Sequence, residues 1–560
     1  MTGISNGDQV SGEAETMKTL EREASSSKGK STSRAPSASY DLEANGAQKP
    51  EHDDKPEHQP ENQKPGWRRM ISHIGPGFLV CMAFIDPGSV ETLFQTASQN
   101  QYQLLWVILL GFILVFIVQS LAANLGVVTG MHLAEHYRLE YPKYLNYCFW
   151  ILAEAAVIGA DISEVIGTAF ALDILLHIPV WVGILLTGLT PFLLVGLQKY
   201  GFRKVEMALA MVVFVIAACF VGELPYVKPK ASEVFKGFIP GFNNRDAVAN
   251  GIAFLGALIM PHNLFIHSAL VLTRRPPQSV KGINDACRYF AIESAPPMAL
   301  ALFINIVAIV VAGSICFASN ISPGTAAACK NLTLYNGAIL LKDVLGKWSR
   351  LVYGISLLAS AQGSALTVGC SGQYVMQGFL QKKTKKWIIT VVTRGLAILP
   401  SLIAALVGGP SACARLIIIS SMILSFELPF TILPLLRFTS SRKKMGPHKN
   451  HIAVIIAAWI LGLCAVGINV YYLSVGFVEW LIHNNLPKAA SVIIGIIVFP
   501  IMIVYLVTSV YVIFKKVDVA TYKPPPPLPL PTNKDSMGET IEEEEEIPYR
   551  EDLVEMAESE

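Results

Sequence analysis

Charge is scarce in this chain of 560 residues. Asp, Glu, Lys and Arg make up only 15% of it, while hydrophobic residues make up 52% and the mean hydropathy is +0.46. Soluble globular domains carry about 25% charged residues, so the class of water-soluble enzymes is excluded. The chain also has no nucleotide-binding loop, no basic patch typical of nucleic-acid binding and no Cys-x-x-Cys pair. These absences argue against ATP-driven chemistry, nucleic acid as a partner and a thiolate metal site.

A cleavable signal peptide is also missing, because residues 1–65 are polar and contain no apolar core. We therefore expect this segment to be a disordered cytoplasmic tail, and the first apolar span to direct membrane insertion. The other end of the chain, 517–560, contains a proline-rich stretch at Pro524–Pro531 and an acidic run at Glu542–Glu546. Both compositions are typical of solvated segments, so we predict a second disordered cytoplasmic tail.

Long hydrophobic runs fill the rest of the chain and indicate an all-α polytopic membrane protein. Apolar windows of about 20 residues predict about twelve spans. They lie near 70–98, 104–130, 145–172, 178–197, 203–222, 246–272, 290–318, 349–380, 386–408, 412–437, 451–475 and 488–514. Lys and Arg gather in alternate connections and are absent near 99–103, 173–177 and 409–411, although the loops 223–245 and 319–348 contain some Lys. By the positive-inside rule, both termini are predicted to be cytoplasmic.

The loop near 319–348 carries two further signs of an external face. Asn331-Leu332-Thr333 is an N-glycosylation sequon, and Cys316 and Cys329 could form a disulfide in an oxidising compartment. Sequons also occur by chance, and the pairing of the two cysteines is left open at this point. Together the two signs favour a lumenal or extracellular loop.

Two tetrapeptides interrupt apolar spans with helix-breaking and ionisable residues. They are Asp86-Pro87-Gly88-Ser89 and Met260-Pro261-His262-Asn263. An ionisable group inside a bilayer costs several kcal/mol unless it faces protein or water, so such groups predict functional sites. Unwound backbone at this depth is tolerated only where it lines a cavity or ligand. Two broken helices in corresponding halves of a membrane protein indicate the substrate site of a transporter.

The two motifs together offer ligands of mixed hardness for a divalent cation. Asp86 supplies a carboxylate, and breaks at the prolines would free the main-chain carbonyls of Ala83 and Ala257. The thioether of Met260 is a poor ligand for magnesium or calcium and an acceptable one for softer transition metals. The alternative for Met260 is plain packing in a membrane helix. Its position in a second broken helix favours the metal site.

With these residues in view, the chain resembles the natural-resistance-associated macrophage protein (Nramp) family of proton-coupled metal transporters. The resemblance rests on DPG, on MPHN followed by LFIHSALVLTR, and runs from about Trp67 to Lys516. Segments such as QSLAANLGVVTG, HIPVWVG and ILSFELPF are similar to the plant branch. The family implies a LeuT-type fold in a transporter domain of about 66–516, with inverted five-helix repeats near 70–222 and 246–437 and extra helices near 451–514.

The resemblance also implies a ligand set, and this chain departs from it. The family's metal ligands correspond to Asp86, the carbonyl of Ala257 and Met260, but its Asn after DPG is Ser89 here. A Gln of the tenth helix corresponds to the Ser420-Ser421 stretch, with Ser421 as the candidate ligand. Hydroxyls are shorter and weaker ligands than carboxamides, so the site either tolerates the change or favours harder ions.

Three acids of the third span suggest a route for protons. Glu154, Asp161 and Glu164 lie seven and three residues apart, which places them on one face of a helix. They match the family's proton route. The resemblance adds Arg394 as counter-charge and His262 and His267 near the metal, with Asp86 as the coupled acid. The alternative is a structural ion-pair network, with His267 as a gating or core residue.

Taken together, the sequence predicts a secondary active transporter and no enzyme or resident cofactor. It would import Mn²⁺ or Fe²⁺, with Cd²⁺ as a further candidate, together with protons across a lipid bilayer. The main alternative is a carrier of Al³⁺ or Mg²⁺, while a metal sensor and an amino-acid carrier fit less well. The resemblance of the PYREDL tail to that of root-uptake members favours the plasma membrane, with vacuolar or other endomembranes as the alternative. No oligomeric state is predicted.

Overall fold

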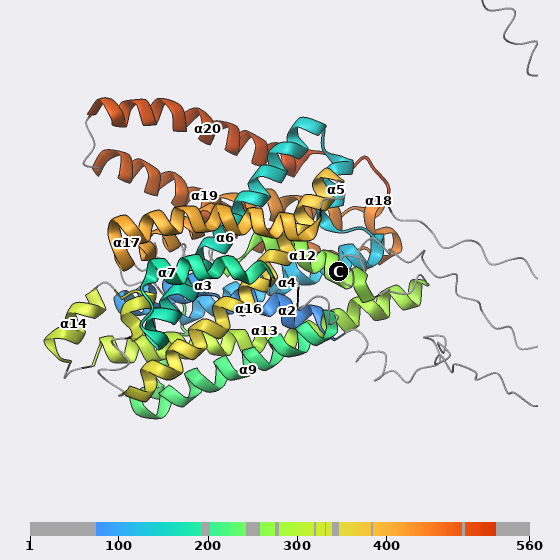
Figure 1. The fold of residues 1–560 in the computed structure, drawn as a ribbon. Helices are drawn as coiled ribbons and strands as arrows, with labels where there is room; N and C mark the ends of the chain where they lie inside the picture. The colour runs from blue at the N-terminus through green and yellow to red at the C-terminus, as the bar shows by residue number, and fades with distance from the viewer. Residues whose placement is uncertain are drawn as a thin grey trace, which may run out of the picture. The chain divides into compact units, whose positions relative to one another are not determined.

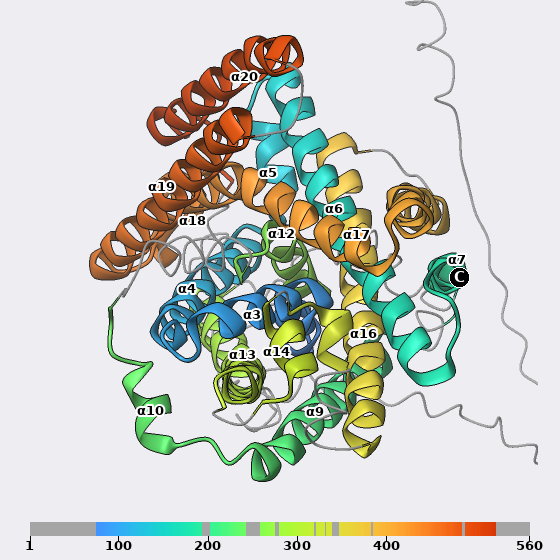
Figure 2. The same cartoon turned by 90° about the vertical axis from the view of Figure 1, so that its left-hand side faces the viewer.

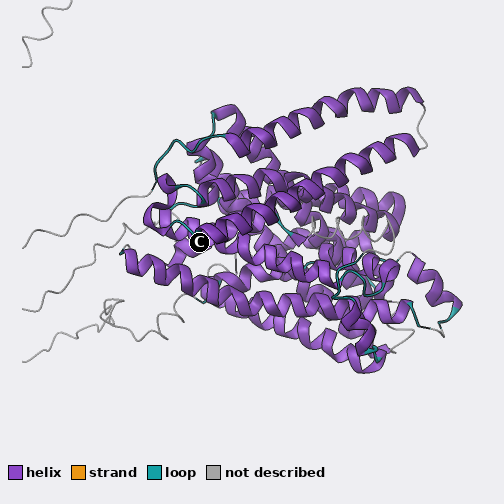
Figure 3. Ribbon diagram, turned by 180° about the vertical axis from the view of Figure 1, so that it is seen from behind, coloured by secondary structure: helices purple, strands orange, loops and turns teal. Residues whose placement is uncertain are grey.

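A computed structural model describes most of the apolar part of the chain. The described residues are 74–192, 196, 202–241, 258–274, 279–318, 321–330, 332–338, 347–381, 385–483 and 488–521. Every regular element within these ranges is a helix (Figure 3). The tail predicted at 1–65, Ala257 and Asn331 all lie outside the described residues.

The helices follow the apolar runs of the sequence, in an order that Figure 1 traces by colour. In chain order they are α2 Pro76–Cys81, η2 Met82–Ile85, α3 Pro87–Asn100, α4 Leu105–Thr129, α5 Leu133–Glu140, α6 Lys143–Leu176, α7 Val180–Leu186, η3 Thr187–Leu189, α9 Phe202–Val227, α10 Ala231–Lys236, α12 Pro261–Leu270, η4 Val271–Arg274, α13 Val280–Cys316, α14 Pro323–Lys330, α16 Lys347–Leu380, α17 Lys386–Thr439, α18 Arg442–Met445, η5 Gly446–His448, α19 Ile452–His483 and α20 Lys488–Phe514.

The predicted spans coincide with these helices wherever the chain is described. Among the described residues, seven helices are long and apolar enough to cross a membrane, and the bent pair of α2–η2 and α3 makes an eighth. Two shorter apolar helices, Val180–Phe192 and Ala210–Gly222, lie where further spans were predicted. The multi-pass all-α fold is therefore confirmed, while the count of twelve stays a prediction.

The stretch of 54 residues labelled α17 contains two of the predicted spans, which are two helices joined across a kink. The break between them is at Gly409, whose φ of 63° and ψ of −156° are non-helical. Glycine adopts positive φ at no steric cost, which explains why the turn forms there and is followed directly by Pro410. The sequence thus places a boundary between two spans within 409–411, where no Lys or Arg was found.

The broken helices lie at the centre of the bundle. Seen end-on in Figure 2, α3 and α12 are surrounded by α4, α6, α13, α16 and α17, while α19 and α20 lie at the edge. Burial agrees with this arrangement: 83% of the most apolar window of α6 is buried, against 28% for α19 and 11% for α20. The last two helices therefore add to the core bundle without forming its centre.

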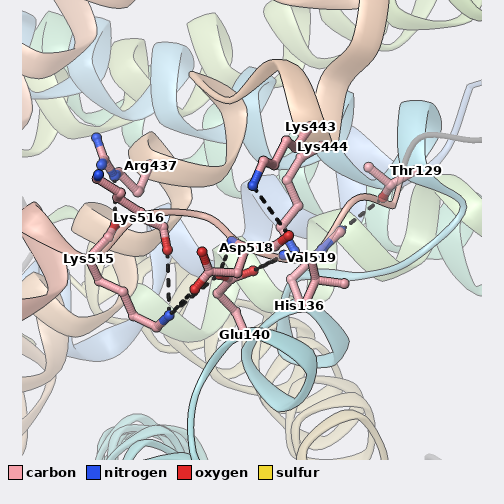
Figure 4. A network of polar contacts seen from close by, with 10 residues as sticks. All are labelled: Thr129, His136, Glu140, Arg437, Lys443, Lys444, Lys515, Lys516, Asp518 and Val519. Atoms are coloured by element: carbon pink, nitrogen blue, oxygen red, sulfur yellow. Dashed lines mark hydrogen bonds and ion pairs between the residues drawn. The ribbon is translucent and has the colours of Figure 1, made fainter.

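Glu140, a buried acid at the end of α5, connects α5 to two distant segments of the chain at one end of the bundle (Figure 4). Its carboxylate pairs with Lys444 Nζ of α18 at 3.1 Å and with Lys515 Nζ at 3.6 Å. The backbone N–H groups of Asp518 and Val519 donate to it at 2.7 and 3.4 Å. The first residues of the predicted C-terminal tail are therefore bound to the helical bundle.

The opposite end of the bundle holds α14 (Figure 1) and the predicted external loop. Cys316 at the end of α13 and Cys329 of α14 are joined by a disulfide across a separation of 13 residues. The N–H of Leu334 donates to the carboxylate of Glu91 on α3, and Tyr353 on α16 donates to the Leu334 carbonyl at 2.7 Å. The loop is therefore bound to α3, the second half of the first broken span.

Candidate functional site

The first helix break is centred on Asp86. The helical segment Pro76–Ile85 ends there, Asp86 is extended with φ of −72° and ψ of 161°, and α3 departs at 43°. Asp86 then caps α3: its Oδ1 accepts the Ser89 N–H at 2.9 Å and its Oδ2 accepts the Gly88 N–H at 3.0 Å. Pro87 at the first helical position has no N–H to satisfy. The DPGS motif thus forms a helix break at Asp86, and Asp86 then caps the helix that begins at Pro87.

The carboxylate of Asp86 is buried, with 3% of the residue exposed, and makes no ion pair with any described residue. Gly88 allows the third span to approach closely. A Cβ on Gly88 would lie 2.8 Å from Asp86 Oδ2 and 3.1 Å from Ser163 Oγ of α6. Any larger residue at this position would push α6 away from the break. The site is therefore built where α3 and α6 meet.

The carbonyls that precede the break are partly held by neighbouring helices. Asn305 on α13 donates to the Phe84 carbonyl at 2.9 Å, and Ser360 on α16 donates to the Ile85 carbonyl. The Ala83 carbonyl differs from these, because its normal partner four residues on is Pro87, which has no N–H. Pro87 thus removes the usual helical donor of the Ala83 carbonyl, and the role of this carbonyl as a ligand stays a prediction.

The second break has the same design on α12. Met260 is the extended residue before the helix, with φ of −81° and ψ of 111°, and Pro261 is the first helical residue. Met260 is 5% exposed, and its carbonyl accepts the Asn263 N–H at 3.1 Å. Pro261 removes the N–H that the Ala257 carbonyl would use, although Ala257 itself lies outside the described residues. The break at Met260 is thus present, and its preceding half is not described.

The polar residues of α12 connect this break to the first one. Asn263 Nδ2 donates to the Val80 carbonyl of α2 at 3.3 Å. His267 Nδ1 lies 3.0 Å from Gln119 Oε1 on α4. His262 is 1% exposed, and neither of its ring nitrogens has a hydrogen-bond partner among the described residues. His267 is therefore fixed by a neighbouring helix on one side, whereas His262 is not.

Several buried polar atoms near the two breaks lack a hydrogen-bond partner within the described ranges. They are Ser89 Oγ, Glu164 Oε2, both ring nitrogens of His262, Asn263 Oδ1 and His267 Nε2. Leaving a polar atom buried and unpaired costs about 1–3 kcal/mol, so such atoms normally meet a ligand or water. A set of them beside an unpaired carboxylate fits a site for a cation and its water molecules.

Helix α6 carries the three predicted acids, and each has a different environment. Asp161 Oδ1 pairs with Arg394 of α17 at 3.1 Å, with both side chains almost fully buried. Glu154 is half-buried and accepts the Trp150 indole N–H at 3.3 Å. Glu164 is fully buried, and its Oε2 has no hydrogen-bond partner among the described residues. The three acids thus follow one another along α6, with the ion pair of Asp161 between Glu164 and Glu154.

Ser420 and Ser421, in the tenth predicted span, make different contacts. Ser420 is buried and its hydroxyl lies 2.9 Å from Ser163 Oγ, next to Gly88. Ser421, the predicted ligand, is half-buried and donates to the Ile417 carbonyl of its own helix at 3.1 Å. The hydroxyl that contacts the third span is therefore that of Ser420. Sequence reasoning did not single out Ser163 or Ser420 as a contacting pair.

One buried acid near the first broken helix was also missed. Glu293 on α13 accepts the N–H of Gly75 at 2.8 Å and that of Gly77 at 2.9 Å, so it holds the start of α2. The signal was available, because Glu293 lies within the predicted span 290–318 and any acid in an apolar span deserves the same scrutiny as Asp86. No group of three His, Cys, Asp or Glu residues suited to a metal occurs among the described residues.

The fold and the site together define a membrane transporter of the broken-helix type, in which α3 and α12 each begin at a helix break within a helical bundle. The family model described as natural resistance-associated macrophage protein-like matches residues 77–475. The chain belongs to this Nramp family, as its motifs predicted.

Plant relatives are similar to the chain over nearly their whole length. Metal transporter Nramp6.2 of Populus trichocarpa is 56% identical over 502 residues, which is 89% of this chain and 92% of the relative. Metal transporter Nramp5 of Oryza sativa subsp. japonica is 54% identical over 498 residues, covering 88% and 93%. The predicted resemblance to the plant branch is in line with these relatives.

A solved structure confirms the fold class. A mutant of the manganese transporter of Eremococcus coleocola superposes with a TM-score of 0.72 at 27% identity, covering 80% of this chain and 96% of that one. The same transporter in complex with an aromatic bis-isothiourea substituted compound matches with a TM-score of 0.72 at 28% identity, covering 80% and 95%. The chain is therefore an all-α membrane protein with the Nramp arrangement of helices.

Proposed function

We propose that this protein is a proton-coupled symporter that imports divalent transition metals, Mn²⁺ or Fe²⁺ and as a further candidate Cd²⁺, into the cytoplasm. One observation carries the proposal: Asp86 is a buried carboxylate without a cationic partner among the described residues, at a helix break surrounded by unpaired polar atoms. Several relatives are named metal transporters, and a similar structure is that of a manganese transporter. The Met260 thioether supports ions softer than Mg²⁺ or Ca²⁺.

In this proposal the ion binds between the two breaks. Asp86 supplies the charge, Met260 the soft ligand, and the carbonyls of Ala83 and Ala257 the neutral oxygens, with Ser89 or a water in the remaining position. Only one acid contributes charge, so a single divalent ion remains partly uncompensated in the site. A site of this kind binds its ion without holding it irreversibly, which transport requires.

Proton coupling follows from the same carboxylate. A proton from outside would keep Asp86 neutral until the metal arrives, and a bound cation would then favour the ionised form. The released proton would pass to Glu164 and on to the Asp161–Arg394 pair and Glu154. Rocking of one part of the bundle against the other would open the site to the cytoplasm. His262 and His267 would assist near the metal.

The second candidate function is transport of a harder ion, Al³⁺ or Mg²⁺. Ser89 is the observation that favours it, because its hydroxyl is buried without a partner among the described residues and reaches less far than the family's Asn. Ser421 would also favour a harder ion if its hydroxyl turned away from its own helix and toward the ion. A more hydrated or harder ion would suit such a site better than a fully coordinated Mn²⁺.

Uptake into proteoliposomes with an inward proton gradient separates the two candidates. We expect the wild type to take up Mn²⁺ or Fe²⁺, with little Mg²⁺ or Al³⁺, and to acidify the vesicle lumen as it does so. The Ser89→Asn variant should keep or raise Mn²⁺ uptake. Absent Mn²⁺ uptake in the wild type, restored by Ser89→Asn, would instead support the harder-ion carrier.

The placement in the cell is proposed from the same reasoning. We infer a plasma-membrane protein with both termini in the cytoplasm, with a vacuolar or other endomembrane location as the alternative. In that orientation the Cys316–Cys329 loop and Asn331 lie on the external side, where glycosylation of Asn331 is expected. Loss of a glycan-dependent mass on changing Asn331 to Gln would test the orientation.

A further inference from the structure

A cavity of about 610 Å³ opens at the point where α19 begins. We call it the α19 entry cavity. It lies between α18 with η5 on one side and the first turn of α19 on the other, and its wall includes Arg442, Lys449, Asn450, Ile452 and Ile455. Gly446, with φ of 52°, turns the chain between α18 and η5 and thereby shapes one side of it. The cavity is thus formed by the segment that connects α17 to α19 and by the first turn of α19.

The lining of the α19 entry cavity is positively charged. Arg442 and Lys449 are exposed and make no ion pair with any described residue, and no acid is among the residues that line the cavity. Lys444, on the same short helix as Arg442, is fully buried against Glu140 and does not add to this charge. Two cations are therefore left without a partner from the described residues at one opening.

Asn450 adds a hydrogen-bond donor to the same wall. Its Nδ2 is buried and has no hydrogen-bond partner in the described part of the chain. Buried amide donors are normally satisfied, so an unpaired one in a cavity wall points to a ligand that accepts hydrogen bonds. A phosphate group, which offers several acceptor oxygens and a negative charge, matches the two cations, and it would satisfy the Asn450 amide once that side chain turns toward the cavity.

The position of the cavity indicates that the ligand also has an apolar part. Ile452, the first residue of α19, is 59% exposed, and further along the helix Val454, Ile456 and Ile460 are exposed as well. Because α19 is long and apolar enough to cross a membrane, we expect these exposed aliphatic side chains to contact lipid chains. The cavity would then lie where α19 leaves the hydrocarbon, with Ile452 and Ile455 on the side of the acyl chains.

We propose that the α19 entry cavity binds the headgroup of an anionic phospholipid. Its phosphate would lie between Arg442 and Lys449 and accept a hydrogen bond from Asn450 Nδ2, while its acyl chains follow the exposed face of α19. Basic pockets at the ends of membrane helices recognise anionic headgroups in this way. The proposal is independent of the transported ion.

A bound headgroup would add a third contact to the segment of α18 and η5, which already contacts two other helices. Lys444 connects α18 to Glu140, and His448 Nδ1 of η5 lies 2.7 Å from Asn284 Oδ1 on α13. The lipid would add a contact from the same loop to the start of α19. The bound lipid would thereby connect α19, at the edge of the bundle, to the segment that contacts the helical core.

The test uses the full chain purified in detergent and native mass spectrometry with three probes: dioctanoyl phosphatidylserine, dioctanoyl phosphatidylcholine and inorganic phosphate. We expect the wild type to retain one phosphatidylserine in clear preference to phosphatidylcholine. Changing Arg442 and Lys449 together to Gln should weaken phosphatidylserine binding about 30-fold, because each basic residue near a membrane surface contributes roughly fivefold. Both residues are exposed, so the variant should fold normally.

The matched control changes Lys143 and Lys385 together to Gln, which removes the same charge. Both are exposed: Lys143 is the first residue of α6, and Lys385 directly precedes α17. They lie at the same end of the bundle, where Arg138 of α5 donates to the Gly378 carbonyl of α16 at 2.8 Å. The control should bind phosphatidylserine like the wild type. Equal loss in both variants would overturn the proposal in favour of general surface charge.

A second variant separates a lipid from a free anion. Ile452→Asn makes the lipid-facing wall polar while leaving both cations in place, so it should weaken binding of phosphatidylserine and leave any binding of inorganic phosphate unchanged. Inorganic phosphate that binds the wild type as tightly as phosphatidylserine, with no effect of Ile452→Asn on the lipid, would show a plain anion site and overturn the lipid assignment.

Discussion

Asp86 and Glu140 are both buried acids at helix ends, with 3% and 7% of the residue exposed, yet the protein treats them differently. Glu140 is surrounded by two lysines and two backbone N–H groups drawn from distant segments. Asp86 accepts the two N–H groups of the helix that it caps, and no basic side chain among the described residues pairs with it. One acid has its counter-charge built in, and the other has none among the described residues.

The difference separates a structural acid from a functional one. A buried ion pair costs desolvation of both partners and is retained where it fixes a particular arrangement of segments. A buried carboxylate without such a partner is stable only if it is protonated or meets a cation from outside. Asp86 therefore has the environment expected of a group that alternates between a proton and a metal, whereas Glu140 fixes α5, α18 and the segment after α20.

Asp161 lies between these two extremes. It has a single buried counter-charge, Arg394 at 3.1 Å, while its neighbour Glu164 has an oxygen without a partner among the described residues. Glu140, Asp161 and Asp86 thus form a graded series from an acid with two basic partners, through one with a single partner, to one with none among the described residues. The series gives direct ways to test whether the pairing of an acid decides its role.

The largest effect on stability is expected from Glu140→Gln. This change leaves Lys444, which is fully buried, without its counter-charge, and breaking a buried pair costs about 3–5 kcal/mol. Thermal unfolding of the detergent-purified protein should move to clearly lower temperature. The double variant Glu140→Gln with Lys444→Met removes both charges and should recover much of the loss. An unchanged unfolding temperature in the single variant would mean that the network contributes little.

A somewhat smaller loss is expected from Arg394→Gln. It leaves Asp161 unpaired in the membrane, at a cost of about 3 kcal/mol that protonation of the carboxylate partly offsets. Metal uptake should persist while its dependence on the proton gradient weakens, because the pair lies on the proposed proton route. Flux measured with and without a pH gradient provides the readout. Unaltered proton coupling would assign the pair a purely structural role.

The paired region should also become less stable in acid. Burial, together with the nearby Lys444 charge, holds the pKa of His136 well below its usual value of 6.5. The unfolded chain therefore binds a proton that the native state does not, and stability falls as the pH drops below about 6.5, by up to about 1.4 kcal/mol per pH unit. Unfolding temperatures should fall less steeply with acidification in His136→Asn than in the wild type. Parallel curves would contradict this account.

The smallest effect is expected from Lys515→Met. Lys515 is the outer partner of Glu140, at 3.6 Å, and its side chain is 15% exposed. Without Lys515, Glu140 keeps Lys444 at 3.1 Å as its nearer counter-charge, so the expected loss is smaller than the cost of breaking the fully buried pair. The unfolding temperature should change much less than in Glu140→Gln. A loss as large as that of Glu140→Gln would mean that Lys515, and not Lys444, is the essential counter-charge.

The sequence predicted those parts of the site that depend on local structure. Proline after Asp86 and after Met260 determines the breaks, and helical spacing places Glu154, Asp161 and Glu164 on one helix, as the structure confirms. These features follow from neighbours in the chain, so no tertiary information is needed to find them. The membrane fold followed from the long apolar runs in the same way.

The contacts that link distant segments could not be predicted. Ser163 meets Ser420 across 257 residues, and Glu140 meets Asp518 across 378. A hydroxyl in an apolar helix carries no sign of its partner, and a basic loop such as the one around Lys444 normally indicates a solvated surface. The fold alone shows that one of its lysines is fully buried.

The most direct test of the central claim compares Asp86→Asn with Glu140→Gln in the same preparations, by Mn²⁺ uptake under an inward proton gradient and by thermal unfolding. Removing the unpaired Asp86 charge should reduce uptake to near the background of empty vesicles, because the proposed site loses its charged ligand, while the unfolding temperature stays unchanged or rises. Glu140→Gln should lower the unfolding temperature. Uptake that survives in Asp86→Asn, or a loss of stability there as large as in Glu140→Gln, would contradict the account.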